Sequence, residues 1–354
     1  MELVTKPDFE EARQRWRAFW QHEIMGRPCA AVRAPKAGVE HVPAPPYMAE
    51  ARQPPDLVAQ QHCRHAETTF WGGEAIPFHD PTLGPDAFAA FLGAELRTSP
   101  DSAETSWAVP FVDCWDDILP LRLDPRGDTF ARTIALVKAF AEVGKGRLLA
   151  GMLDLHSNMD ALAAIRGPER LLMDLLDTPE LVDRAMAEVR AFYRPVYEAI
   201  YEAGDMACWG TIGWLPFYCE GRFATVQSDV ICMLSPRQFR RWVLPALEEE
   251  CAYLDHSILH LDGPGALVHL EDLLAIEDLD GIQWVPGAGN PPQHEWMDLL
   301  RRIQAAGKSL YLSADADLVR LYQRELRPEL VFYDCWCTTE EAARELLHWL
   351  ETHT

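Results

Sequence analysis

The C-terminal part of the chain repeats one pattern, and this pattern limits the fold more than any other feature. Four short apolar runs are each followed by an amphipathic helical pattern: Ser257–Asp262, Gly281–Pro286, Ser309–Ser313 and Leu330–Trp336. Near-continuous apolar runs are typical of strands in a parallel sheet that helices cover on both faces. The runs recur about every 21 to 28 residues, the length expected of successive β/α units that close a barrel.

The first of these runs ends in His260 and Asp262 and then breaks at Gly-Pro-Gly, so both side chains lie where a buried strand opens into a loop. Residues i and i+2 of a strand point to the same face, so this imidazole and carboxylate can converge on one point. Together with a remote thiolate the pair would give zinc three protein ligands and one open position. Alternatively, it is a hydrogen-bonded pair that shapes the pocket or acts as acid and base. The residues leave both interpretations open.

Length and charge narrow the class of protein. The chain has 354 residues, of which 48% are hydrophobic, enough to bury the core of one large domain. We expect residues 1–354 to form a single α/β domain, a (β/α)8 TIM barrel. Residues 1–120 include an N-terminal helical and loop extension that is expected to cover the barrel mouth. The net charge of -23 argues against binding to nucleic acid or to anionic membranes. No signal-peptide pattern opens the chain and no apolar run approaches the roughly 20 residues of a membrane span, so we expect a cytoplasmic protein.

The upstream patterns predict the remaining elements. We expect helices over Phe9–Glu23 and Asp56–Thr69, strands over Pro28–Arg33, Leu148–Leu153 and Ala207–Ile212, and a long folded loop over Trp71–Gly93. The later helices carry start signals: Ser-Pro-x-Gln from Ser235, a capping box at Thr338 and Glu341, and helical patterns over Gln293–Ala306, Asp315–Glu325 and Thr338–Trp349.

Further candidate residues lie near other strand ends. Asp154 and His156 repeat the i, i+2 spacing and are predicted to be catalytic, with Asn158 lining the same pocket. Aromatic side chains at a barrel mouth can enclose a cation, a flat ring or a corrinoid face. On that basis the predicted substrate-binding residues include Trp71, Trp107, Trp214, Gln283 and Trp284, with plain packing as the alternative for each tryptophan.

Two histidine motifs look like metal motifs, but we interpret them as surface or helix-cap residues. The pair His62 and His65 lies on a helical pattern without an evident third ligand, and the segment at His294 lacks the second histidine of HExxH.

Several segments resemble the uroporphyrinogen decarboxylase-like superfamily of (β/α)8 barrels, which includes corrinoid-dependent and cobalamin-independent methyltransferases. They are HLDGPGALVHLEDLL, IQWVPGAG, SDVICMLSPRQFRRWVLP and LAAIRGPERLLMDLLDTPELV, with weaker likeness in WGGEAIP and LGPDAFAAFLG. In the methyltransferase branch a His-x-Cys pair and a cysteine at the last strand end hold zinc. The matching positions are His260, Asp262 in place of the first cysteine, and Cys335 or Cys337, of which Cys337 directly precedes the last helix.

The resemblance implies a corrinoid-type methyltransferase with zinc at His260, Asp262 and Cys337, which exchanges a methyl group between a small substrate and a separate corrinoid protein. A carboxylate ligand makes zinc better at polarising a bound oxygen or nitrogen than at activating a thiol, so we expect transfer from a small donor to the corrinoid. One alternative is a metal-assisted decarboxylase or lyase of a small carboxylated substrate. The arginine-rich pattern that would hold a porphyrinogen is missing. The other alternative is a non-catalytic binding protein on the same barrel.

Overall fold

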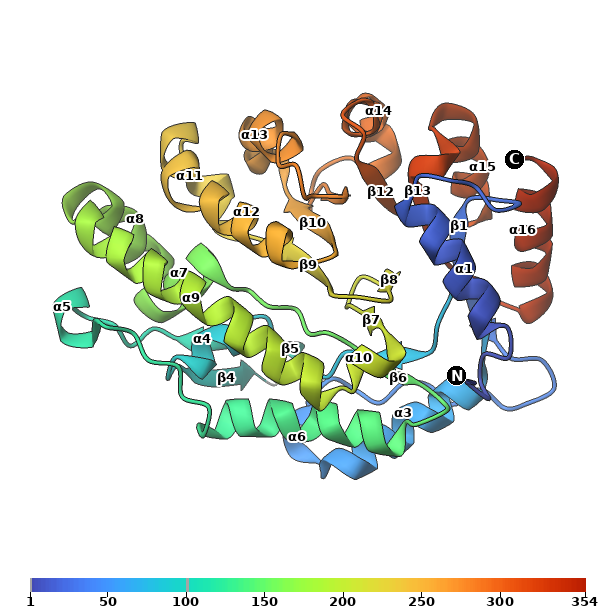
Figure 1. Ribbon diagram of the computed structural model, residues 1–354, viewed down its shortest axis with the longest axis horizontal. Coiled ribbons are helices and arrows are strands. Elements are labelled where there is room, and N and C mark those ends of the chain that lie inside the picture. Colours follow the sequence, from blue (N-terminus) through green and yellow to red (C-terminus); the bar gives the residue numbers. More distant parts are fainter. Residues whose placement is uncertain (1, 100–101) are drawn as a thin grey trace.

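The computed structural model describes residues 2–99 and 102–354, and its centre is a seven-stranded sheet (Figure 1). The strand order is β2-β1-β13-β12-β11-β10-β9. The strands are β1 (Cys29–Pro35), β2 (Thr69–Gly73), β9 (Phe223–Gln227), β10 (His256–Asp262), β11 (Gly281–Val285), β12 (Ser309–Ser313) and β13 (Val331–Trp336). All neighbours pair in parallel except β2, which runs antiparallel to β1.

Shorter ladders make up the rest of the strand structure. Strand β3 (Phe78–His79) pairs in parallel with β6 (Leu149–Ala150), and Met152 forms a parallel bridge to Gly213. Two hairpins are antiparallel: β4 (Glu95–Ser99) with β5 (Ser102–Val109), and β7 (Thr211–Ile212) with β8 (Tyr218–Cys219). Within the described residues these ladders are not hydrogen-bonded into one closed ring, so the observed fold is a mixed α/β fold with a mainly parallel sheet.

Helices follow the strands and cover them. In the first half they are α1 (Phe9–Trp20), α2 (Met48–Arg52), α3 (Pro55–Glu67), α4 (Ala87–Phe91), α5 (Trp115–Ile118), α6 (Asp128–Val143), α7 (Asn158–Arg166), α8 (Pro168–Asp177), α9 (Pro179–Ala203) and α10 (Met206–Trp209). In the second half they are α11 (Pro236–Trp242), α12 (Leu244–Tyr253), α13 (Leu270–Leu274), α14 (Met297–Ala305), α15 (Ala316–Glu325) and α16 (Glu340–Thr352). Figure 1 shows α11 to α16, yellow to red, along the upper side, with α3 and α6 along the lower edge. Among the described helices, none combines the length and apolarity that crossing a bilayer requires.

The regular C-terminal elements lie where the sequence pattern predicts them. Strand β12 has the predicted bounds, and α11 begins with the predicted capping box, in which Ser235 accepts from the backbone N–H of Gln238. The cap of α16 differs by one residue, because Thr339 rather than Thr338 accepts from the N–H of Ala342, at 3.1 Å.

Helix α1 lies at the amino-terminal ends of the strands. The ring of Trp16 is 4.9 Å from that of Phe332, the second residue of β13. Trp20 stacks at 4.1 Å on His256, the first residue of β10. We expected the N-terminal extension to cover the carboxyl ends of the strands, whereas the aromatic face of this helix closes the opposite end.

Candidate functional site

The carboxyl end of the sheet carries a row of polar side chains on three neighbouring strands. The β10 residue His260 is in register with Gln227 of β9 on one side and with Gln283 of β11 on the other. Its Nδ1–H donates to Oε1 of Gln283, at 2.5 Å, and its ring meets that of Trp214 edge-on at 5.4 Å. The structure therefore brings together three residues that the sequence predicted for the site: His260, Gln283 and Trp214.

The second predicted pair is connected to this row. Nε2 of Gln227 donates to Oδ1 of Asp154 at 2.5 Å, and Nε2 of His156 lies 3.1 Å from Oδ2 of the same carboxylate. Burial alone would lower the pKa of His156, but the hydrogen bond to Asp154 and its charge outweigh burial and raise the pKa to about 9. His156 therefore carries a proton and a positive charge at neutral pH.

Asn158 fixes the loop that carries this pair. It is fully buried, and its backbone has a φ of 51°, in the left-handed region that asparagine tolerates better than most residues. Its Nδ2 donates to the backbone oxygen of Gln227 and to Oε1 of Glu250, both at 3.2 Å. Because its side chain has no exposed surface, Asn158 positions the loop rather than lining an open pocket.

A third polar group, which the sequence analysis did not identify, lies on β1, β12 and β13. Tyr311 donates its hydroxyl to Oδ2 of Asp334 at 2.7 Å, and Arg33 forms an ion pair with the other oxygen of that carboxylate. Each of these residues is a single polar position within an apolar run. The isolated aspartate within the buried run VFYDCW was the signal that could have pointed to the group.

The three predicted zinc ligands are not gathered. Asp262 is exposed at the end of β10, whereas Cys337 follows β13. On β13, Asp334 shares a face with Tyr311 through their hydrogen bond, so alternation places Cys337 on the other face, toward the helices. Among the described residues, the ligand atoms of His260, Asp262 and Cys337 do not lie within 4.8 Å of one another. This arrangement does not fit a shared zinc ion, and we derive no chemical step from one there.

Of the other predicted tryptophans, Trp284 and Trp71 are buried in the packing between the sheet and its helices. Trp284 is 1% exposed and packs against Trp296 of the following 3-10 turn (Gln293–Trp296) at 5.1 Å, on the helix side of β11. Trp71 is buried in β2, with its indole N–H bonded to a backbone carbonyl of α3 at 2.9 Å. Trp107 is 41% exposed on the β4–β5 hairpin.

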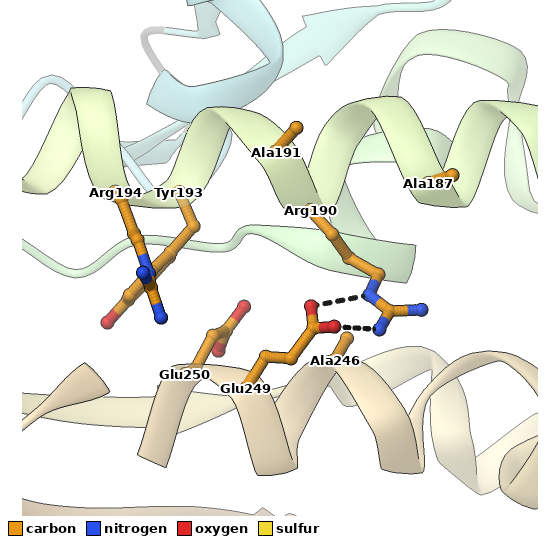
Figure 2. A pocket seen from close by; sticks show the side chains of 8 residues that line it. All are labelled: Ala187, Arg190, Ala191, Tyr193, Arg194, Ala246, Glu249 and Glu250. Atoms are coloured by element: carbon orange, nitrogen blue, oxygen red, sulfur yellow. Dashed lines mark hydrogen bonds and ion pairs between the residues drawn. The ribbon is translucent and has the colours of Figure 1, made fainter. Parts of the chain in front are cut away.

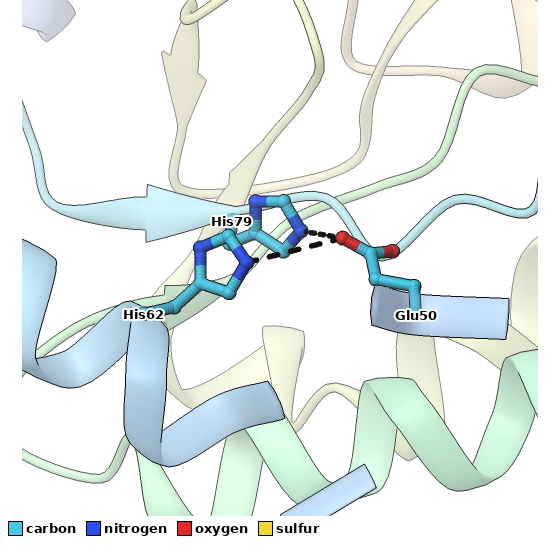
Figure 3. Close-up of side chains that lie close together, drawn as sticks. All are labelled: Glu50, His62 and His79. Atoms are coloured by element: carbon cyan, nitrogen blue, oxygen red, sulfur yellow. Dashed lines mark hydrogen bonds and ion pairs between the residues drawn. The ribbon is translucent and has the colours of Figure 1, made fainter. Parts of the chain in front are cut away.

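A compact cluster of ionisable side chains lies at the end of β3 (Figure 3). Glu50 of α2, His62 of α3 and His79 of β3 are the one group of three His, Cys, Asp or Glu residues among those described whose ligand atoms lie within 4.8 Å of one another. We expected His62 to be a surface or cap residue, but it is only 6% exposed. Burial lowers the pKa of His62 to about 2, and the nearby His79 adds to the effect.

This cluster lies close to the Asp154 pair. The backbone oxygen of His79 accepts from the N–H of Gly151 at 2.7 Å, and the chain reaches Asp154 three residues later. Burial raises the pKa of Asp80 to about 7 against the opposing charge of His79, and the charges of Glu50 and Asp154 contribute to the rise. Asp80 is therefore electrostatically coupled to both groups of residues.

A cavity of about 480 Å³ lies elsewhere, in the layer of helices between α9 and α12 (Figure 2). Its charged side chains already have partners. Arg190 binds the carboxylate of Glu249, with Nε 2.9 Å from Oε2, and the guanidinium of Arg194 lies 4.9 Å from the ring centre of Tyr253. We assign this cavity no part in the candidate site.

Comparison with known proteins gives one fold-level result. The chain matches no model of a protein family and no curated protein sequence. It is similar to a solved structure, a methyltransferase from Methanosarcina mazei, with 12% sequence identity and a TM-score of 0.64. The match covers 96% of this chain and 98% of that chain, so the two share their fold from end to end.

Proposed function

We propose that this chain is a corrinoid-type methyltransferase of the uroporphyrinogen decarboxylase-like superfamily, a (β/α)8 barrel that moves a methyl group from a small donor to a corrinoid carried by a separate protein. The end-to-end fold similarity to a methyltransferase supports the class. Because a fold hosts many activities, the site must carry the argument. The observation that carries it is the contact of His156 with Asp154 near the carboxyl ends of the strands, which raises the pKa of the imidazole to about 9 and so favours its protonated form.

The proposed chemistry uses His156 as a general acid. When the bond between the methyl carbon and its nitrogen, oxygen or sulfur breaks, the electron pair stays on that heteroatom. The Nδ1–H of His156 has no hydrogen-bond partner among the described residues and is available to donate its proton to that atom. Asp154 orients the ring and Gln227 orients Asp154, while His260 and Trp214 bind the donor. A corrinoid, when bound with its carrier protein, would supply the methyl acceptor.

The test is to mix the purified chain with cob(I)alamin and a panel of methylated amines, ethers and thioethers, and to follow the corrinoid spectrum. We expect methylation with at least one donor class. Replacing His156 with Gln should slow it by about 10²–10⁴-fold, the usual contribution of a general acid. His348→Gln is the matched control, because His348 is 77% exposed on α16 and should leave the rate unchanged.

The other outcomes separate the alternatives. Demethylation of methylcobalamin by thiols, without any methylation of cob(I)alamin, would show that the direction is wrong. Loss of carbon dioxide from a small carboxylated substrate would favour the decarboxylase. Binding of small molecules without turnover in any assay would favour the non-catalytic protein. A wild-type rate in His156→Gln would remove that histidine from the mechanism.

A further inference from the structure

The cluster at the end of β3 has the composition of a metal site. We propose that Glu50, His62 and His79 bind one divalent transition-metal ion, with zinc as the preferred ion, at a site distinct from His260, Asp262 and Cys337 (Figure 3). This proposal does not depend on the proposed methyl transfer.

The donor set suits zinc. Two imidazole nitrogens and one carboxylate oxygen are a three-ligand set of catalytic zinc sites, which keep a fourth position for water or substrate. Nε2 of His62 lies 3.9 Å from Oε1 of Glu50, and Nε2 of His79 hydrogen-bonds the same oxygen. Bonds of about 2.0–2.2 Å in a tetrahedron place ligand atoms about 3.3 Å apart. Shifts of about 1 Å or less, in which the ion replaces the shared hydrogen bond, would therefore complete the site.

The second observation is the way the two imidazoles are arranged around one carboxylate. His62 is 6% exposed, and among the described residues its ring nitrogens make no hydrogen bond, although Nε2 faces Glu50. The ring stacks on that of His79, with centroids 3.6 Å apart, and both rings point a nitrogen at Glu50. A bound ion would give His62 a bond in place of this longer contact and explain why two imidazoles converge on one carboxylate.

The surrounding contacts hold the three ligands in place. The second oxygen of Glu50 accepts from the N–H of Thr82 at 2.6 Å, and Arg132 of α6 donates to the backbone oxygen of Glu50, with its Nε at 3.0 Å. Phe140 of the same helix packs against both imidazoles, with centroids 5.3 Å from His62 and 4.9 Å from His79. Supporting contacts of this kind orient ligands in metal sites. The side chain of His79 is 20% exposed, which leaves one side of the cluster accessible for an ion and a fourth ligand.

The test measures zinc directly. The full chain is stripped with a chelator, equilibrated with zinc and desalted, and its metal content is determined by elemental analysis. We expect about one zinc per chain, and a more than tenfold weaker affinity in His62→Ala, His79→Ala and Glu50→Gln. Glu50→Gln keeps the size of the side chain, so it separates loss of a ligand from loss of folding. His65→Ala, on the same helix as His62, is the matched control and should bind like the wild type.

Cobalt(II) distinguishes the two candidate zinc sites. A site of two nitrogens and one oxygen gives visible ligand-field bands without the near-ultraviolet charge-transfer band of a cobalt–thiolate bond. The proposal is overturned if no zinc binds, if His62→Ala and His79→Ala retain wild-type affinity, or if a thiolate band appears and Cys337→Ala abolishes binding. Loss of the zinc-induced rise in melting temperature in Glu50→Gln, with far-UV circular dichroism unchanged, would support it.

Discussion

The two halves of the molecule reach their candidate sites by different routes. From β9 to α16, strands of five to seven residues alternate with helices, and each strand pairs in parallel with the next in sequence. From β1 to α7, two of the strands have only two residues, one pair forms an antiparallel hairpin and three helices have four or five residues. In the regular half, the repeated β/α units place the polar side chains of the candidate site at the carboxyl ends of the strands. In the irregular half, Glu50, His62 and His79 come from three separate elements and meet only in the folded chain.

The first test of this comparison concerns what stabilises the irregular half. Glu74 is buried, binds Arg27 with Oε1 2.9 Å from Nη2, and accepts from the N–H of Ala30 at 2.8 Å. Glu74→Ala removes the bidentate partner of the buried Arg27 and leaves it only the more distant, half-exposed Glu351, at 3.8 Å. Breaking a buried ion pair in this way typically costs about 3–5 kcal/mol. Urea unfolding followed by circular dichroism measures the loss. Glu95→Ala, which removes an exposed partner from the same half, should leave the midpoint unchanged; an equal effect of both variants would contradict the prediction.

The regular half should instead depend on apolar packing. Trp284 is 1% exposed, and its indole N–H has no hydrogen-bond partner among the described residues, so truncation removes packing only. Trp284→Ala should lower the free energy of unfolding by about 3–4 kcal/mol. Trp336→Ala, at a side chain that is 49% exposed, should cost much less. A Trp284→Ala variant that is as stable as the wild type but binds the methyl donor more weakly would instead support the substrate-binding role that the sequence predicted for Trp284.

The same contrast explains how much could be predicted from the sequence. Apolar runs and caps predicted β10 to β13 closely. The rule that functional residues follow strand ends selected His260 and Asp154, and the structure brings both next to Gln227. Gln227 was missed because a single glutamine at the end of an apolar strand has no spacing signal, although its amide donates to Asp154.

The cluster in the irregular half was missed for a different reason. His62 and His65 share a helix face at i, i+3 spacing, but only His62 is buried, and neither β3 nor α2 has enough residues to show a period. The sequence therefore did not reveal that Glu50 and His79 approach His62. Which side chains meet there depends on tertiary contacts between segments without a regular register.

A carboxylate connects the two halves and makes their contact sensitive to pH. Glu250 of α12 accepts from the hydroxyl of Ser157 at 2.7 Å and from Asn158 of α7, and burial raises its pKa from 4.5 to about 7 against these hydrogen bonds. The folded state therefore holds the proton more tightly than the unfolded state, and stability falls as pH rises from about 4.5 to 7. This group alone accounts for about 3 kcal/mol of that fall.

Glu250→Gln, which cannot ionise, tests this assignment. We expect the stability of the variant relative to the wild type to rise by about 3 kcal/mol between pH 4.5 and pH 8. Urea unfolding at a series of pH values measures it. Asp160, whose pKa burial also raises, to about 6, is present in both proteins, and its charge adds to the raised pKa of Glu250. A difference that does not change with pH would show that Glu250 ionises normally in the folded protein.

The smallest expected effect lies at the helix starts. In the regular half, α11, α15 and α16 begin with side-chain caps, whereas α2, α3 and α6 of the irregular half begin without one. Ser235→Ala removes the hydroxyl that accepts from the N–H of Gln238, at 3.4 Å, and should cost about 1 kcal/mol.

A matched variant tests the other residue of this capping box. Gln238→Ala keeps the serine but removes the amide oxygen that accepts from the N–H of Ser235 at 2.9 Å and from its hydroxyl at 2.7 Å. Its loss should cost at least as much as Ser235→Ala. The hydroxyl–amide bond is lost in either single variant, so the double variant should cost less than the sum. Urea midpoints of the three variants measure this, and strict additivity would show that the two residues act independently.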